Sequence, residues 1–145
     1  TCALPISEHK QHSTQQTNLS LCGTARYASL NNHMGISQSR RDDMEALFFV
    51  WLYFLREGKL PWMKSGLRGK ELYRHILQVK ASMTMEEMCK GVPFEFLKYI
   101  RMVRELKFEE APNYDMLLQL FLSLYRRKGY TEQAPWDWEQ QNSSE

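Results

Sequence analysis

Hydrophobic residues recur along most of the chain at the spacing of an amphipathic α-helix. The strongest example is a set of apolar residues at positions i, i+3, i+4, i+7, i+10 and i+11: Tyr114, Leu117, Leu118, Phe121, Leu124 and Tyr125. This pattern predicts a helix that stops at Gly129, because glycine commonly ends helices. The three basic residues before Gly129 suit the negative end of a helix dipole.

A second pattern predicts a helix from about Arg41 to Gly58. Asp42 and Asp43 favour a helix start, because carboxylates in the first turn complement the helix dipole. Its apolar residues cover nearly the whole circumference: Met44, Leu47, Phe48, Trp51, Leu52, Phe54 and Leu55. A helix that is apolar all round is expected at the centre of a domain, wrapped by other helices.

Three further helices are predicted between these two. An amphipathic pattern covers Gly69–Lys80, and residues 82–90 contain a short helix with the Thr-x-x-Glu pattern of a capping box, at Thr84 and Glu87. The third begins at Pro93, a residue that suits the first helical position, and runs to Phe108. No segment shows sustained alternation with period two, so the predicted fold class is mainly α.

The two ends of the chain are predicted to lie outside the helical core. Residues 1–6 resemble the translation of a sequencing adapter, so we interpret them as a scar, with a genuine divergent start as the alternative. The first residue is Thr rather than Met, and we expect the beginning to be missing. Residues 7–22 are polar and predict a mobile loop, and residues 139–145 predict a frayed tail.

Composition is that of one ordinary globular domain: 145 residues, of which 43% are hydrophobic and 25% charged. Nineteen Lys and Arg against 17 Asp and Glu leave a formal charge of +2, which favours neither nucleic acid nor membrane as a partner. The longest uncharged apolar run, Ala46–Leu55, is half of the roughly 20 residues that a bilayer-spanning helix needs. Three cysteines without C-x-x-C spacing, and no secretory segment, favour an intracellular location, in the cytoplasm, the nucleus or both.

Two segments carry a family resemblance: residues 23–31 (GTARYASLN) and residues 38–45 (QSRRDDME). They resemble the end of the activation segment and the following central helix of the casein kinase 1 family of Ser/Thr protein kinases. The likeness continues through four shorter motifs, in the family's order: LPW at 60–62, CKG at 89–91, FEEAP at 108–112 and DW at 137–138. Met44 and the FEEAP run look most like the alpha-type members. By this resemblance, residues 7–22 correspond to an activation loop and residues 23–138 to a partial kinase domain.

The resemblance implies roles for several residues. Arg26 looks like part of an anion site that reads a phosphate or acidic group on the substrate, which a guanidinium fork suits. Thr24, beside Gly23 in the substrate-docking loop, looks like the residue that contacts the catalytic aspartate. Asp43 matches a helix aspartate that binds the catalytic-loop backbone. The plainer alternatives are a surface arginine for Arg26 and a helix cap for Asp43.

The chain lacks the residues that phosphoryl transfer requires. It contains no G-x-G-x-x-G loop, no Val-Ala-Ile-Lys strand and no Asp-Phe-Gly. Arg40 stands where a His-Arg-Asp loop would have its histidine, and Leu47 stands where the metal-binding asparagine would be. The parent kinase would use ATP and Mg²⁺, whereas this chain is expected to bind neither and to be inactive alone. Without a catalytic loop, the central helix is also expected to expose apolar surface.

The chain departs from the family pattern at named positions. Phe48 occupies a position where the central helix usually carries glycine. Leu72 replaces a basic residue that contributes to the anion site; the nearby cations Arg68, Lys70 and Arg74 are candidates to substitute for it. Preference for phosphate-primed substrates is therefore open.

Two other patterns carry weaker chemistry. His9 and His12 form an H-x-x-H pair without a third ligand, so no metal site is predicted. A row of basic residues, Lys98, Arg101, Arg104 and Lys107, predicts a solvated helix face rather than a nucleic-acid patch.

The leading hypothesis is a fragment of a casein kinase 1-like Ser/Thr kinase, with the N-lobe and catalytic loop absent. The parent would transfer the γ-phosphate of ATP to Ser or Thr of protein substrates near acidic or phosphorylated residues. The alternative is a non-catalytic truncated isoform or pseudokinase that acts as a protein-interaction module. Neither hypothesis includes nucleic acid or membrane, and the oligomeric state is not assigned.

Overall fold

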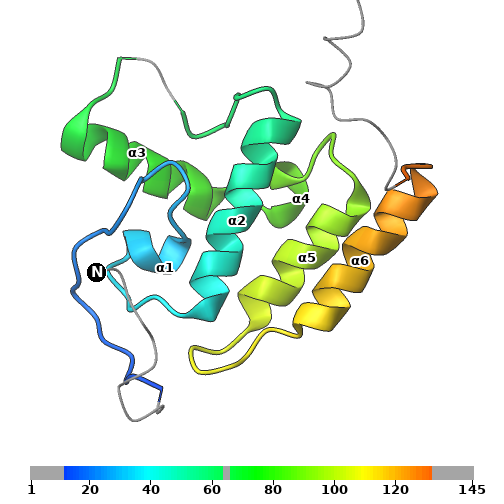
Figure 1. The fold of residues 1–145 in the computed structure, drawn as a ribbon. Helices are drawn as coiled ribbons and strands as arrows, with labels where there is room; N and C mark the ends of the chain where they lie inside the picture. Colours follow the sequence, from blue (N-terminus) through cyan, green and yellow to red (C-terminus); the bar gives the residue numbers. More distant parts are fainter. Residues whose placement is uncertain (1–11, 64–65, 132–145) are drawn as a thin grey trace, which may run out of the picture. The chain divides into compact units, whose positions relative to one another are not determined.

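The structure, a computed structural model, describes residues 12–63 and 66–131, and these form helices joined by loops (Figure 1). The helices in chain order are α1 (Leu30–His33), α2 (Arg40–Leu55), α3 (Gly69–Ser82), α4 (Met85–Met88), α5 (Phe94–Glu105) and α6 (Tyr114–Arg127). No strand occurs in these ranges, which confirms the mainly α prediction. The same ranges hold no helix with the length and apolar character that crossing a membrane takes.

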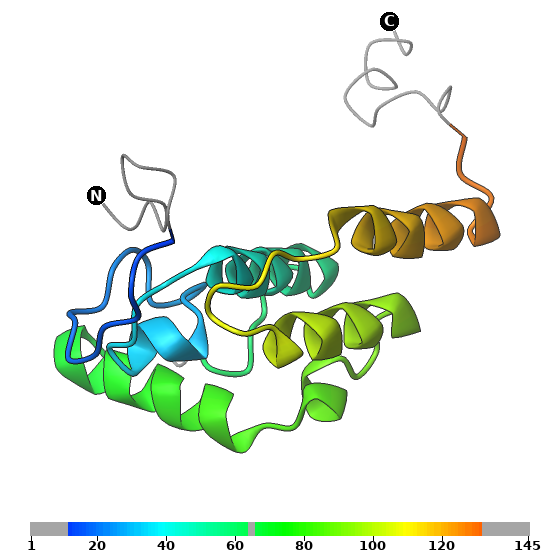
Figure 2. The same ribbon diagram turned by 90° about the horizontal axis from the view of Figure 1, so that it is seen from below.

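The chain divides into two compact units, the first ending at Pro112 and the second starting at Asn113. In the first unit, α2 lies between α1 and α5, and α3 packs against α1 (Figure 1; Figure 2). Phe48, Phe49 and Leu52 of α2 are completely buried, as predicted for a central helix. Other helices do not wrap α2 on every side, because Leu47 is 38% and Phe54 71% exposed. Apolar exposure of this helix was the expectation for a chain without a catalytic loop.

Aromatic rings form the middle of the first unit. The Phe48 ring lies 5.6 Å from Phe49 and stacks on Tyr99 at 6.5 Å between centroids. Phe49 in turn meets the edge of Trp62 at 5.0 Å, and Trp51 meets Tyr99 at 5.0 Å. Phe48 is therefore accommodated as a full member of the core.

Most predicted helix ends are confirmed within a few residues. The Gly58 N–H donates to the Tyr53 carbonyl at 2.8 Å, which closes α2 in a left-handed turn, and Gly58 has φ +81°. The capping box of α4 is present, with the Glu87 N–H donating to Thr84 Oγ1 at 3.1 Å and the Thr84 N–H donating to Glu87 at 2.7 Å. The helix after Pro93 ends at Glu105, three residues before the predicted Phe108.

Helix α1 was not predicted from the sequence. Ser29 caps it by accepting from the Asn32 N–H at 3.1 Å, and Gly35 follows it at φ +70°. A Cβ at Gly35 would lie 2.6 Å from the Leu19 carbonyl oxygen, so only glycine fits there. The Leu19 N–H donates to Gly35 at 2.9 Å, which ties part of the predicted mobile segment to the body; residues 7–11 of that segment lie outside the described residues.

The second unit contains α6, which begins where the sequence predicts. Asn113 caps the helix by accepting from the Met116 N–H at 3.0 Å. Gly129, at φ +74°, follows the basic C-terminal residues, as expected for a helix stop. The family motif at residues 137–138 and the predicted frayed tail lie outside the described residues.

Candidate anion-binding loop

The loop before α1 contains the residues that the family resemblance singles out. In this 23–29 loop, the Thr24 carbonyl accepts from the N–H groups of Tyr27, at 3.0 Å, and Ala28, at 3.2 Å. These bonds form a tight turn with Arg26 at its tip. Gly23, at φ +82°, and Thr24 are both exposed beside it. The sequence-predicted Gly23, Thr24 and Arg26 therefore lie together on one turn.

Three side chains from elsewhere hold the backbone of the 23–29 loop. Lys80 of α3 donates to the carbonyls of Ala28, at 2.7 Å, and Ala25, at 3.2 Å. The Trp62 indole N–H donates to the Arg26 carbonyl at 2.9 Å, and His33 of α1 bonds the Ala25 carbonyl at 3.1 Å. The loop carbonyls are thus used for anchoring.

The Arg26 side chain is left available by this arrangement. Its guanidinium lies 5.8 Å from the ring centroid of Tyr27 and 5.6 Å from that of Tyr53. Within the described part of the chain it forms no ion pair, and its Nε has no hydrogen-bond partner. A half-buried guanidinium between two rings can bind a phosphate or carboxylate group.

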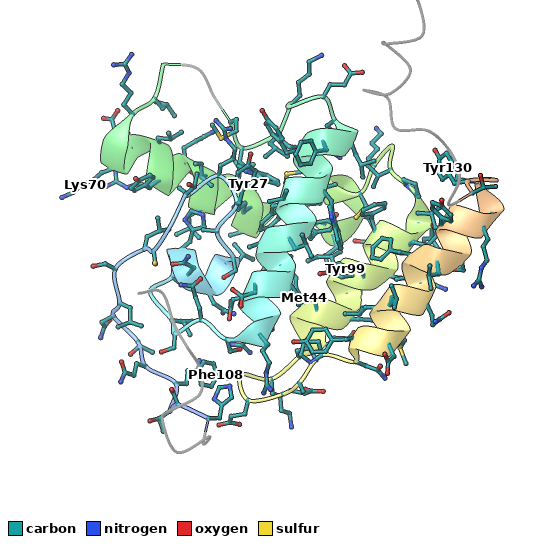
Figure 3. The ribbon with its side chains drawn as sticks, in the orientation of Figure 1. Tyr27, Met44, Lys70, Tyr99, Phe108 and Tyr130 are labelled. Atoms are coloured by element: carbon teal, nitrogen blue, oxygen red, sulfur yellow. The ribbon has the colours of Figure 1, made fainter. Side chains whose placement is uncertain are left out.

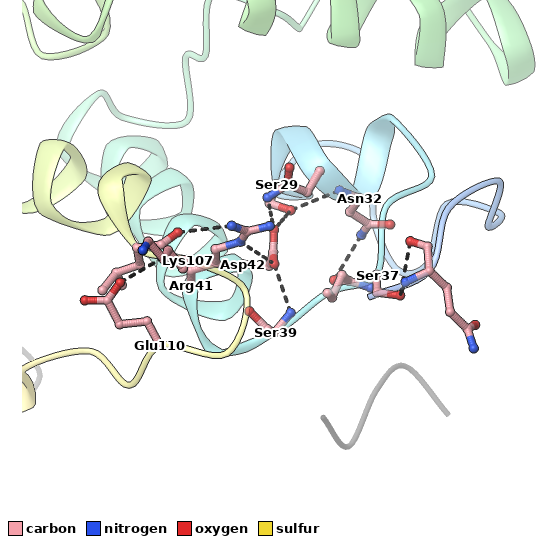
Figure 4. A network of polar contacts seen from close by, with 12 residues as sticks. Ser29, Asn32, Ser37, Ser39, Arg41, Asp42, Lys107 and Glu110 are labelled. Atoms are coloured by element: carbon pink, nitrogen blue, oxygen red, sulfur yellow. Dashed lines mark hydrogen bonds and ion pairs between the residues drawn. The ribbon is translucent and has the colours of Figure 1, made fainter. Parts of the chain in front are cut away.

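A buried carboxylate joins the end of the 23–29 loop to α2 (Figure 4). Asp42 accepts hydrogen bonds from the Ser29 hydroxyl at 2.7 Å, the Asn31 amide at 3.0 Å and the Ser39 N–H at 2.9 Å. It is 1% exposed. Asp43, which the sequence analysis assigned a structural role, is exposed and takes no part in this network. Partial desolvation and the neighbouring Asp42 raise the pKa of the Asp43 carboxyl.

The weaker candidates for the anion site lie at the start of α3 and not on the 23–29 loop. Arg68 and Lys70 are exposed at the start of α3. Figure 3 shows Lys70 at the outer end of α3, away from Tyr27 in the loop. Leu72, where the family has a basic residue, is half-buried. In this structure Arg26 is the cation that the loop itself presents.

Three of the site residues, Lys80, Trp62 and His33, were not predicted from the sequence. The position of Lys80 held a usable signal, because it follows Ile76 by four residues and so shares its buried face. The sequence analysis used Lys80 only as the end of the predicted helix and gave its side chain no role.

The predicted solvated basic face is wrong for one of its members. Arg104 pairs with the buried Glu45 at 2.9 Å, whereas Arg101 pairs with the exposed Glu86. Burial raises the pKa of the Glu45 carboxyl, and the Arg104 guanidinium opposes that rise. The pair therefore fastens α5 to α2.

Other reactive side chains give no separate site. Cys89 is a buried free thiol whose pKa burial raises to about 11, so it is a poor nucleophile. Cys22 is disulfide-bonded, a state that the sequence analysis did not predict. His12 meets the edge of Phe108 at 4.8 Å, and its predicted neighbour His9 lies outside the described residues. Across those residues, no group of three or more His, Cys, Asp or Glu side chains could hold a metal ion.

The half-buried anchor His33 makes a prediction about acid stability. Desolvation, and then the nearby Lys80, lower the pKa of His33 to about 4, whereas an unfolded histidine titrates near 6.5. The stability that neutral His33 contributes is therefore complete above pH 6.5 and is lost as the pH falls toward 4. After allowance for partial exposure, we expect the wild type to lose about 2 kcal/mol more of its free energy of unfolding between pH 7 and pH 4 than His33→Gln loses.

Urea unfolding at both pH values measures this difference. His75→Gln, the same substitution on α3, is the matched control and should keep the wild-type acid sensitivity. An equal loss of stability in wild type and His33→Gln would contradict the prediction.

The arrangement as a whole offers anion binding on a loop whose backbone carbonyls are hydrogen-bonded to the body of the unit. It holds a cation for a phosphate or carboxylate group and exposed backbone beside it, where an extended peptide could lie. No protein-family model matches the chain. The likeness to casein kinase 1 rests on the sequence segments described above.

Proposed function

We propose that this chain is the helical C-lobe portion of a casein kinase 1-like Ser/Thr protein kinase and supplies its substrate-docking loop. The observation that carries the proposal is the 23–29 loop, whose backbone is anchored at three carbonyls while Arg26 keeps a guanidinium without an acidic partner in the described chain. Such a loop suits a protein substrate with a phosphate or acidic group near the reacting Ser or Thr.

The outer face of α2 supports the same proposal. Asp43, Leu47 and Phe54 follow one another at i, i+4 and i+11, which places them on one side of a helix. All three are exposed, Phe54 to 71%. A central helix that packs against a catalytic loop would present such a face when that loop is absent, with Asp43 free to bind loop backbone.

In the parent enzyme, the chemistry would come from outside these residues. ATP with Mg²⁺ would supply the transferred γ-phosphate, and the upstream half would supply the catalytic base and metal ligands. This chain would contribute Arg26 for substrate recognition, Gly23 and Thr24 beside it, and the helical scaffold beneath. Alone, it is proposed to bind substrates without catalysing transfer.

Phe48 favours a second candidate function, a non-catalytic interaction module. Its ring is completely buried and packs against Phe49 and Tyr99, although the family usually has glycine at this position. A core that has adjusted to a large ring indicates divergence from the common kinase pattern. A truncated isoform or pseudokinase could still use Arg26 to compete for substrates.

Peptide binding tests the role of Arg26 that both candidates share. Fluorescence anisotropy would compare a labelled peptide carrying phosphoserine with its unphosphorylated counterpart. We expect the wild-type chain to prefer the phosphopeptide and Arg26→Gln to weaken binding by about 10- to 100-fold, since bonds to charged groups contribute about 1.5–3 kcal/mol. Arg126→Gln removes the same charge from α6 and should bind normally. Equal affinity of wild type and Arg26→Gln would count against the anion site.

The sequence encoded upstream of Ser7 separates the two candidates. A Gly-rich loop, a strand lysine, His-Arg-Asp with its asparagine and Asp-Phe-Gly would identify an active-type kinase. An initiator Met close to Ser7 would leave the interaction module as the function.

A further inference from the structure

Lys80 is unusual because lysine is almost never completely buried unless it is paired. It is 0% exposed, and it forms no ion pair within the part of the chain that the structure describes. Its Nζ instead donates to the carbonyls of Ala28, at 2.7 Å, and Ala25, at 3.2 Å. The same Nζ lies 4.1 Å from the ring centroid of Phe49 and 5.0 Å from that of Trp62.

The two carbonyls that Lys80 holds lie on either side of Arg26 and Tyr27. Fixing Ala25 and Ala28 therefore fixes the backbone from which the Arg26 side chain projects. The Trp62 indole N–H adds a third bond, to the Arg26 carbonyl that lies between them, at 2.9 Å. The backbone on both sides of the Arg26 side chain is thus fixed from within the protein, and Lys80 makes two of the bonds.

We infer that Lys80 is a positioning residue for anion binding: its buried amine holds the 23–29 loop in the conformation that presents Arg26, and protonation of this amine loosens the loop. The inference rests on the proposed function only for the identity of the bound group. The hold on the loop follows from the burial of Lys80 and its two hydrogen bonds.

The direction of the proton effect follows from the groups around Lys80. Burial lowers the pKa of Lys80 to about 7, Glu45 of α2 opposes that shift, and Arg104 of α5 adds to it. His33 of α1 stays neutral at this pH because burial lowers its pKa to about 4. An open loop would return Lys80 to water, where lysine titrates near 10.4. Between these two pKa values the open form binds more protons, so closure strengthens as the pH rises.

Amide exchange in the full chain, measured by NMR from pH 7 to pH 9, tests the inference. The N–H groups of Tyr27 and Ala28 report loop closure because both donate to Thr24. After correction for intrinsic exchange rates, their protection should rise toward tenfold per pH unit in the wild type. Lys80→Met should lower this protection and remove its pH dependence, while the α5 amides should keep their wild-type protection.

Lys98→Met is the matched control. Lys98 also lies over a ring, 5.3 Å from the Phe94 centroid, but it is exposed on α5. It should behave as wild type. Wild-type protection and slope in Lys80→Met, or an equal loss of protection in the loop and in α5, would overturn the inference.

A second measurement needs no variant. The ¹³Cε shift of Lys80 in the wild-type chain should titrate with a midpoint near 7, and a midpoint near 10 would overturn the inference. The phosphoserine peptide then separates this inference from the proposed function. If wild type and Lys80→Met bind the peptide equally, the inference fails and the proposed function stands. If the wild type does not bind the peptide, the proposal that Arg26 forms an anion site is wrong. The exchange and titration results would then still test whether Lys80 holds the 23–29 loop.

Discussion

Asp42→Ala is expected to lower the free energy of unfolding by about 3–5 kcal/mol, the cost typical of removing one partner from a buried charged network. The carboxylate accepts from Ser29, Asn31 and Ser39, and Arg41 Nε lies 3.6 Å from it. Without it, the buried Ser39 N–H and the Ser29 hydroxyl lose their acceptor in a place that water does not reach. Urea unfolding monitored by circular dichroism measures the loss.

The neighbouring residue supplies a matched control. Asp43 has the same side chain, lies one position further along α2 and is exposed. Asp43→Ala removes only a favourable contact with the helix dipole, so it should cost no more than about 1 kcal/mol. If the two substitutions lower the free energy of unfolding equally, the buried hydrogen bonds of Asp42 would not contribute the expected stability.

This pair also shows what sequence reasoning could and could not supply. Two adjacent aspartates at a helix start predict the start correctly, because either carboxylate complements the dipole. Which of them is buried depends on the register of α2 against α1 and on the donors Ser29 and Asn31, which precede α2 by nine residues or more. Hydrophobic periodicity carries no information about that register.

The helices themselves were largely predictable because their signals are local. The capping box at Thr84 and the glycine stop at Gly58 each need only neighbouring residues, and both are confirmed. Helix α1 escaped prediction because four residues are too few to show a period. The early end of the helix after Pro93 has a tertiary cause: Arg41 donates to the Leu106 carbonyl at 3.0 Å, and Leu106 has extended backbone.

Of the candidate site, only the solvent-facing loop residues were proposed from the sequence. Arg26 was found through its motif, which is local in sequence. The anchors beneath it, Lys80, Trp62 and His33, come from three separate segments, and each has a common alternative role as a surface or core residue. Only the fold brings them to the carbonyls of one loop, so the inward half of the site required the structure.

Phe48→Gly is expected to have the largest effect on stability of any substitution considered. Removing a buried phenylalanine side chain costs about 3–5 kcal/mol, and glycine inside a helix costs about 1 kcal/mol more than alanine. Phe48 is completely buried and stacks on Tyr99, so its neighbours cannot close the space without moving α5. Phe48→Ala, measured alongside by urea unfolding, separates the lost ring from the glycine effect.

The result also bears on the two candidate functions, because glycine is the residue that the kinase family usually carries here. If the core retained the common kinase packing, restoring glycine would relieve overpacking and stabilise the chain. A loss of about 4–6 kcal/mol would instead mean that the core has adjusted to the ring, as expected for a diverged module. Phe54→Ala on the exposed face of α2 is the control, and it should change stability by less than about 0.5 kcal/mol. A more stable Phe48→Gly chain would therefore contradict the packing of Phe48 described above and favour a core packed as in the common kinase pattern.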